Sequence, residues 1–151
     1  MNTTLELIGA PTDIGASVRG AGMGPDALRV AGLPEALARQ GYMVIDRGNL
    51  AGPATPWAPP TNGLRHLDEV IAWNRSVYNA VDTALGANHV PLMMGGDHCL
   101  AIGSISAVAW HARKRGKKLR VLWLDAHSDV NTETTSPSGN LHGMPVSCLL
   151  G

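Results

Sequence analysis

Four short apolar runs recur along the 151-residue chain and constrain its fold more than any other feature. They read LELIGAP, YMVIDRG, HVPLMMGG and LRVLWLD, and they cover residues 5–11, 42–48, 89–96 and 119–125. Each run is too short for an ordinary helix, and the last two are nearly continuous rather than alternating in polarity. Such runs are typical of parallel strands that are buried on both faces of a sheet.

Stretches with helical periodicity separate these runs. Residues 25–40 carry apolar side chains at helical intervals and are divided by Pro34, while 64–86 and about 100–115 each predict one longer helix. The segment 51–62 contains four prolines and predicts a surface loop. Strands that alternate with helices predict an α/β fold with three layers, in which a mainly parallel sheet lies between two layers of helices (α/β/α). The connections between its strands should be right-handed.

Composition excludes several classes of function. Twelve basic and twelve acidic residues balance, which argues against nucleic acid or an anionic membrane as the main partner. The N-terminus lacks a signal peptide and no long apolar window is present, so we expect a cytoplasmic protein outside the membrane. Cys99 and Cys148 are too few for a disulfide scaffold and should be reduced; Cys99 has no activating base nearby in sequence and is not expected to be a nucleophile.

Two polar clusters, GGDH and DAHSD, follow the third and fourth apolar runs. Ligands of parallel α/β sheets gather at the carboxyl ends of strands, where both clusters should lie. In an extended chain Asp125, His127 and Asp129 project to one side, and His98 can join them from the neighbouring strand end. Two carboxylates and imidazoles directed at one point need a cation, so the set predicts a divalent-metal site.

A less specific interpretation also exists for each cluster. A single Asp-x-His motif is common, and a polar residue at a strand end is often only a helix cap. The two clusters at adjacent strand ends together favour the metal site over this alternative. Asp97 should support the loop rather than bind metal, because in an extended chain it points away from His98.

Longer stretches around these clusters resemble a known family. GGDHCLAIGSISA (95–107) and LDAHSDVNTETTSPSGNLHGMPVSCLL (124–150) look like the first two metal-binding signatures of the ureohydrolases, and SGNLHGMP (138–145) is specifically similar to arginases. The glycine-rich stretch 8–33, with its GP-x-x-LR helix start, resembles the N-terminal pattern of the family. The resemblance implies an arginase/deacetylase-like fold in which 1–151 forms the N-terminal part of a single domain that is about twice as long.

The resemblance also implies a metal centre. By this likeness His98, Asp125, His127 and Asp129 would be ligands of two Mn²⁺ ions, with Asp125 bridging them, and two further aspartate ligands would belong to the C-terminal half. Carboxylate and imidazole ligands without thiolate suit manganese, although they also bind zinc, cobalt or iron.

The activity implied by the resemblance is hydrolysis of L-arginine to L-ornithine and urea, in arginine metabolism and the urea cycle. A metal-bridging hydroxide would attack the guanidinium carbon. Asp129 would then protonate the departing amine and His142 would shuttle protons to solvent. Asn131 and Ser138 would hold the amino-acid end of the substrate.

Two alternatives stay open at this stage. An agmatinase or guanidinobutyrase would use the same metal chemistry, although Asn131 and Ser138 favour a substrate with an α-amino-acid end. A non-catalytic metal-binding remnant would explain a chain with four of six expected ligands. For the complete protein the likeness implies a homo-oligomer, either a trimer or a hexamer.

Overall fold

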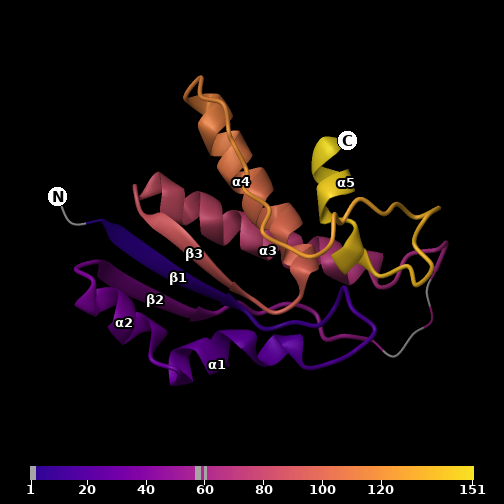
Figure 1. Cartoon of the computed structure of the whole chain (residues 1–151), viewed down its shortest axis with the longest axis horizontal. Helices are drawn as coiled ribbons and strands as arrows, with labels where there is room; N and C mark the ends of the chain where they lie inside the picture. Colours follow the sequence, from indigo (N-terminus) through magenta and orange to yellow (C-terminus); the bar gives the residue numbers. More distant parts are fainter. Residues whose placement is uncertain (1–2, 57–58, 60) are drawn as a thin grey trace.

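Three parallel strands form the centre of the computed structural model, which describes residues 3–56, 59 and 61–151 (Figure 1). The strands are β1 (Thr4–Ala10), β2 (Met43–Asn49) and β3 (Val90–Gly95), and their order in the sheet is β2-β1-β3. Both neighbours pair with β1 in parallel. Three of the four predicted strands are therefore confirmed within about two residues of their expected bounds.

Helices cover both faces of this sheet, as the sequence predicts (Figure 1). On one face lie α1 (Gly24–Val30) and α2 (Leu33–Arg39), and on the other lie α3 (Leu67–Gly86) and α4 (Ala101–Lys114). The remaining elements are the short helices η1 (Ala21–Met23), η2 (His98–Leu100), η3 (Leu141–Gly143) and α5 (Pro145–Leu150). Of the predicted proline-rich loop 51–62, residues 57, 58 and 60 lie outside the described part.

The core lies between the sheet and α3. The buried residues of α3 include Val70, Trp73, Val77 and Val81, which are spaced three or four residues apart and so share one face. A side chain at Gly103 would collide with the carbonyl O of Asn74. Glycine at this position therefore lets α4 approach α3 closely.

A buried carboxylate on the central strand is the polar exception in this sheet. Glu6 is 2% exposed, and its carboxylate oxygens lie 2.8 Å from Nε of Arg47 and 2.7 Å from Nδ1 of His89. The hydrogen bond from Arg47 outweighs the effect of burial and, with His89, lowers the pKa of Glu6. The charge is thus compensated from β2 on one side and from the residue directly before β3 on the other.

The predicted strand over 119–125 is wrong for this structure, where residues 117–124 have no regular secondary structure. Among the described strands β3 pairs with β1 alone, so the sheet ends there. A β-strand needs a hydrogen-bonded neighbour, and no described segment supplies one for residues 119–125. The segment instead runs back along α4 (Figure 1), and Leu122 and Leu124 are 81% and 95% exposed.

Two expectations about the chemical setting of the chain can also be compared with the structure. Within the described ranges, none of the helices is long and apolar enough to span a membrane. Cys99 and Cys148 are both free thiols, as their number and spacing predict.

Candidate metal centre

The turn after β3 leads directly into η2, at the start of which His98 lies. A side chain at Gly96 would collide with the backbone of Thr12, so only glycine allows the chain to turn so tightly against the end of β1. Asp97 then caps η2, because its Oδ1 accepts a hydrogen bond of 2.8 Å from the backbone N–H of Cys99. Asp97 therefore supports the loop, as the sequence predicts, and His98 begins the helix.

Two carboxylates meet the ring of His98. Its Nδ1 lies 2.9 Å from Oδ2 of Asp129 and 3.3 Å from Oδ2 of Asp125. One ligand atom of each residue lies within 4.8 Å of the others, close enough for the three to share one metal ion. Three of the four predicted ligands are thus brought together.

The donor set fits a divalent cation. Asp129 is buried, and its Oδ2 has no hydrogen-bond donor because the contact with His98 does not meet the geometry of a hydrogen bond. A buried carboxylate oxygen without a donor is unfavourable, and a bound cation would compensate it. Imidazole nitrogen together with carboxylate oxygen is a ligand set that Mn²⁺ and related ions accept.

His127 lies outside this group, because the chain turns at Asp125 instead of continuing extended. The backbone N–H of His127 donates to Oδ1 of Asp125 at 2.8 Å, which is the main cause that lowers the pKa of Asp125. The His127 ring is 82% exposed and its Nδ1 lies 3.2 Å from the same Oδ1. His127 therefore lies beside Asp125 and lines the same hollow, but outside the group of three, and its role as a metal ligand stays a prediction.

Asp129 reaches the site through a left-handed backbone conformation, with φ of 50°. Its carbonyl O accepts hydrogen bonds from the backbone N–H groups of Val146 and Ser147 at 3.0 and 3.4 Å. Aspartate tolerates this conformation better than most residues. The first turn of α5 therefore fixes the position of Asp129.

A hollow of about 690 Å³ opens beside the three ligands. Asn131 and His142 line it together with His98 and the 125–129 segment. Ser138 is not among the lining residues, and its Oγ accepts a hydrogen bond of 3.3 Å from the backbone N–H of Asn140. The hollow is within the usual size range of small-molecule sites, so it could hold an amino acid.

Two features of the site were not predicted from the sequence. The indole of Trp123 stacks on the ring of His98, with centroids 4.8 Å apart and planes at 28°. Asn140 and Ser17 bond to each other through contacts of 2.9 and 2.7 Å, which join the glycine-rich loop to the 138–140 segment. The position of Trp123, two residues before Asp125, is the only sequence signal that could have indicated the stacking on His98. No local pattern indicates the contact between Asn140 and Ser17.

Cys99 sits directly after His98 but does not belong to the chemistry. The thiol is fully buried. Burial raises its pKa far above the ordinary range, and the nearby carboxylate of Asp97 adds to the effect. A thiol in this state is not a nucleophile near neutral pH, as expected.

Comparisons with known proteins identify relatives over the whole chain. The model of the Arginase family matches residues 3–151. The arginase of Brevibacillus brevis is 42% identical over 151 residues, which are 100% of this chain and 49% of that protein. The native structure of the Bacillus caldovelox arginase superimposes with a TM-score of 0.88 at 41% identity, covering 96% of this chain and 48% of that one. The Bacillus subtilis arginase structure gives a TM-score of 0.86 at 40% identity, covering 99% and 47%. The chain spans about half the length of the curated relatives it matches and corresponds to their N-terminal half.

Proposed function

The chain belongs to the arginase family, and from this we propose that it supplies the N-terminal half of a manganese-dependent centre that hydrolyses L-arginine to L-ornithine and urea. One observation carries the proposal: His98, Asp125 and Asp129 converge beside the hollow and leave Oδ2 of Asp129 buried without a donor. The names of the relatives support arginine as the substrate.

His98, Asp125 and Asp129 would hold the metal, with His127 as the fourth ligand of this half once its ring turns toward them. Bound metal would lower the pKa of a coordinated water so that it can attack the guanidinium carbon at neutral pH. The absence of thiolate among the converging ligands favours Mn²⁺ over softer metals.

The residues around the hollow have distinct proposed tasks. Asp129 would take a proton from the attacking water and return it to the departing ornithine amine, because its buried carboxylate lies beside the hollow in which arginine would bind. His142 lines the hollow and is exposed, so it would exchange protons with solvent. Asn131 would bind the amino-acid end of arginine, and Ser138 would join it after a local rearrangement.

The test is urea release from L-arginine and from agmatine with added Mn²⁺. The chain is assayed alone and joined at Gly151 to the C-terminal half of the Brevibacillus brevis arginase. We expect the joined chain to release urea from arginine, and Asp129→Asn to lower the rate by more than about 10³-fold because it removes both a ligand and a proton carrier. Asp82→Asn on α3 is the matched control and should keep the rate.

Each other outcome changes the proposal. Faster urea release from agmatine than from arginine would replace arginase by agmatinase. Unchanged release in the Asp129→Asn variant would remove Asp129 from the mechanism. No release by the joined chain, although it binds Mn²⁺, would favour the non-catalytic remnant.

A further inference from the structure

We propose that Ser17 is a positioning residue, which acts through Asn140 to hold η3, and with it His142, at the edge of the hollow. The task of His142 as a proton carrier rests on the proposed function, whereas its placement by Ser17 does not. Ser17 lies in the glycine-rich loop of residues 13–22, here called the anchoring loop. It is not one of the described residues that line the hollow, so it can act on the reaction only through a neighbour.

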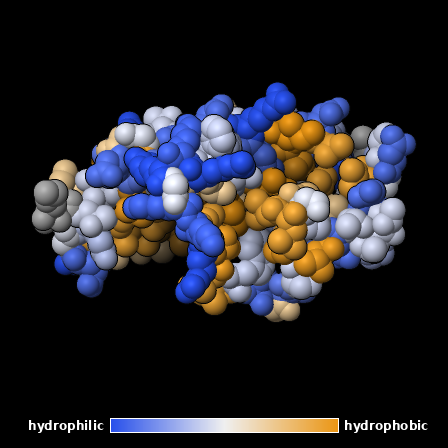
Figure 2. All heavy atoms as spheres, turned by 90° about the horizontal axis from the view of Figure 1, so that it is seen from above, coloured by the Kyte–Doolittle hydropathy of each residue, from blue (hydrophilic) through white to orange (hydrophobic). Residues whose placement is uncertain are grey.

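The helix that carries His142 is too short to fix its own position. η3 comprises 3 residues, Leu141–Gly143, and a single helical turn has few internal hydrogen bonds. Leu141 is 4% exposed and belongs to the core. Hydrophobic contact has no preferred direction, and Figure 2 shows that apolar side chains also lie on the outer surface, next to hydrophilic ones. The position of His142 therefore needs directional contacts from outside η3.

One such contact comes from the residue directly before η3. Asn140 is buried, and its side chain does not cap the helix. Its Oδ1 and Nδ2 lie 2.9 and 2.7 Å from Oγ of Ser17, and a hydroxyl can serve both atoms because it is donor and acceptor at once. Among the described residues, Ser17 is the only one whose side chain bonds to this carboxamide. A buried carboxamide needs such a partner, so the contact fixes where η3 begins.

A second directional contact joins the anchoring loop to His142 itself. The backbone N–H of His142 donates to the carbonyl O of Gly15 at 3.2 Å. A side chain at Gly15 would collide with Oδ1 of Asp97 and with Cys99, so the loop packs directly against η2, which begins with His98. The anchoring loop thus contacts both the helix with a metal ligand and the helix with the proposed proton carrier. It can therefore set the position of one relative to the other.

The anchoring loop is itself held in place. Oδ1 of Asp13 accepts hydrogen bonds from the backbone N–H groups of Gly20 and Gly22, at 3.2 and 2.7 Å, which tie the two ends of the loop together. Ile14 is fully buried in the core. None of these contacts involves the Ser17 side chain. Removal of the Ser17 hydroxyl should therefore release Asn140 and η3 while the loop stays in place.

The release of η3 should affect His142 more than Asn131, the proposed contact for the amino-acid end of the substrate. The backbone N–H of Asn131 donates to the carbonyl O of Gly143 at 3.1 Å, so η3 touches Asn131 as well. The carbonyl O of Asn131 also accepts a hydrogen bond of 2.6 Å from Oγ of Ser147 on α5. Asn131 keeps this second support when η3 is released. Loss of the Ser17 hydroxyl should therefore lower kcat and change KM little.

Steady-state urea release by the chain joined at Gly151 measures this effect. Ser17→Ala should lower kcat for L-arginine about tenfold and change KM by less than about twofold, because proton transfer is sensitive to misplacement by about 1 Å. Ser17→Thr keeps the hydroxyl and should keep kcat within about twofold of the unchanged protein. Ser76→Ala on α3 is the matched control and should leave kcat unchanged, since Oγ of Ser76 bonds to the carbonyl O of Ala72 in the same helix.

A double variant tests the path through Asn140. Asn140→Ala should lower kcat to a similar extent, and Ser17→Ala added to it should cause no further loss, because the two side chains act as one unit. Multiplicative losses in the double variant overturn the proposal. A loss of kcat that Ser17→Thr does not restore also overturns it, as does a raised KM with unchanged kcat.

Amide hydrogen exchange of the chain alone gives a readout that does not depend on activity. In Ser17→Ala the His142 amide should exchange at least about fivefold faster, while amides of β1 stay protected; in Ser76→Ala it should not change. Equal exchange in the two variants overturns the proposal, and so does a loss of β1 protection in Ser17→Ala, which would show a general role in folding.

The two readouts together separate this proposal from the proposed function. Faster exchange of the His142 amide in Ser17→Ala, without urea release by any joined chain, would contradict the proposed function and support the placement of His142 by Ser17. Urea release by the joined chain, with equal exchange of the His142 amide in Ser17→Ala and in the unchanged chain, would support the proposed function and overturn the placement.

Discussion

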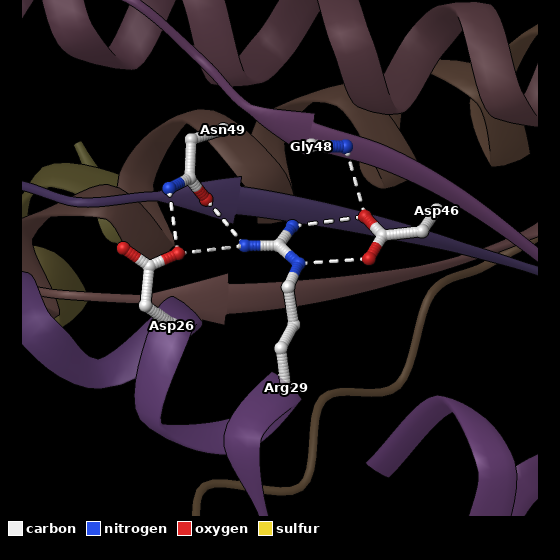
Figure 3. A network of polar contacts seen from close by, with 5 residues as sticks. All are labelled: Asp26, Arg29, Asp46, Gly48 and Asn49. Carbon is white, nitrogen blue, oxygen red and sulfur yellow. Dashed lines mark hydrogen bonds and ion pairs between the residues drawn. The ribbon is translucent and has the colours of Figure 1, made fainter. Parts of the chain in front are cut away.

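Two clusters of carboxylates among the described residues differ in how their charge is compensated. In the first, Arg29 on α1 donates two parallel hydrogen bonds, of 2.7 and 2.9 Å, to Asp46, and its third nitrogen contacts Asp26 and Asn49 (Figure 3). In the second, one carboxylate oxygen of Asp125 and one of Asp129 face the ring of His98 beside the hollow, while the other oxygen of Asp125 accepts from the backbone N–H of His127. The first cluster is closed by a guanidinium of the chain itself.

The difference shows what each cluster is suited to do. In the Arg29 cluster, Asp46 also accepts from the backbone N–H of Gly48, so its oxygens are directed at donors of the same chain. Asp129 keeps a buried oxygen without a donor. Closed networks contribute stability, whereas an uncompensated group beside a hollow is suited to bind a cation from outside.

Bound Mn²⁺ should have the largest effect on the free energy of unfolding, and it should act through the second cluster only. Mn²⁺ at about 100 times its dissociation constant should stabilise the chain by about 2.7 kcal/mol. Asp129→Asn should abolish this gain yet change the metal-free stability by less than about 0.5 kcal/mol, since asparagine also tolerates a positive φ. Thermal unfolding with and without Mn²⁺ measures both quantities. A large loss without metal would show that Asp129 acts mainly in folding.

Removal of the Arg29 guanidinium should have the next largest effect on the free energy of unfolding, with or without bound metal. Arg29→Met leaves Asp46 and Asp26 without their cation and should lower the free energy of unfolding by about 2 kcal/mol. Arg39→Met, at an exposed position of α2, should change it by less than about 0.5 kcal/mol. Urea denaturation provides the comparison, and similar losses in the two variants would deny the Arg29 network a role in stability.

Acid should weaken the first cluster in a defined pH window. The hydrogen bonds from Arg29 lower the pKa of Asp46 in this cluster, and on the central strand, outside the cluster, the hydrogen bond from Arg47 lowers the pKa of Glu6. Both groups therefore stabilise the fold fully above their unfolded pKa values of about 4, and this contribution is lost as pH falls toward the folded values. The part due to Asp46 should be about 1 kcal/mol after allowance for its partial exposure. Urea denaturation from pH 6 to 3 should give a shallower decline for Arg29→Met than for the unchanged chain; equal slopes would contradict the assignment.

The smallest expected effect concerns the stacking of Trp123 on His98. Trp123→Leu should weaken Mn²⁺ binding by about 0.5 kcal/mol, roughly twofold, because the ring no longer fixes the imidazole. Calorimetric titration with Mn²⁺ measures the change. Trp110→Leu is the matched control, since Trp110 is partly exposed on α4 and contacts Lys114 instead. Weaker binding in both variants would point to a general loss of structure.

Strands and helices were predictable where an apolar run or helical spacing in the sequence coincides with a packing partner within the chain. The strands around Leu7 and Leu92 and the helix through Val77 follow directly from apolar runs and helical spacing. The helix start at Leu67, three residues later than expected, was not predictable because His66 adopts a left-handed conformation. Within the site, GGDH and DAHSD marked His98, Asp125 and Asp129 correctly as neighbours in space. The assignments of Asn131, Ser138 and His142 to substrate and protons remain predictions.

Side-chain chemistry and local periodicity are enough to derive the alternation of strands and helices, the balance of charge and the residue types of the metal group. Tertiary structure alone decided that residues 119–124 stay irregular and that His127 lies outside the group. A strand exists only beside a hydrogen-bonded partner, and the direction of a side chain after it depends on that pairing. Local apolar character cannot supply the partner, so neither feature follows from the local sequence.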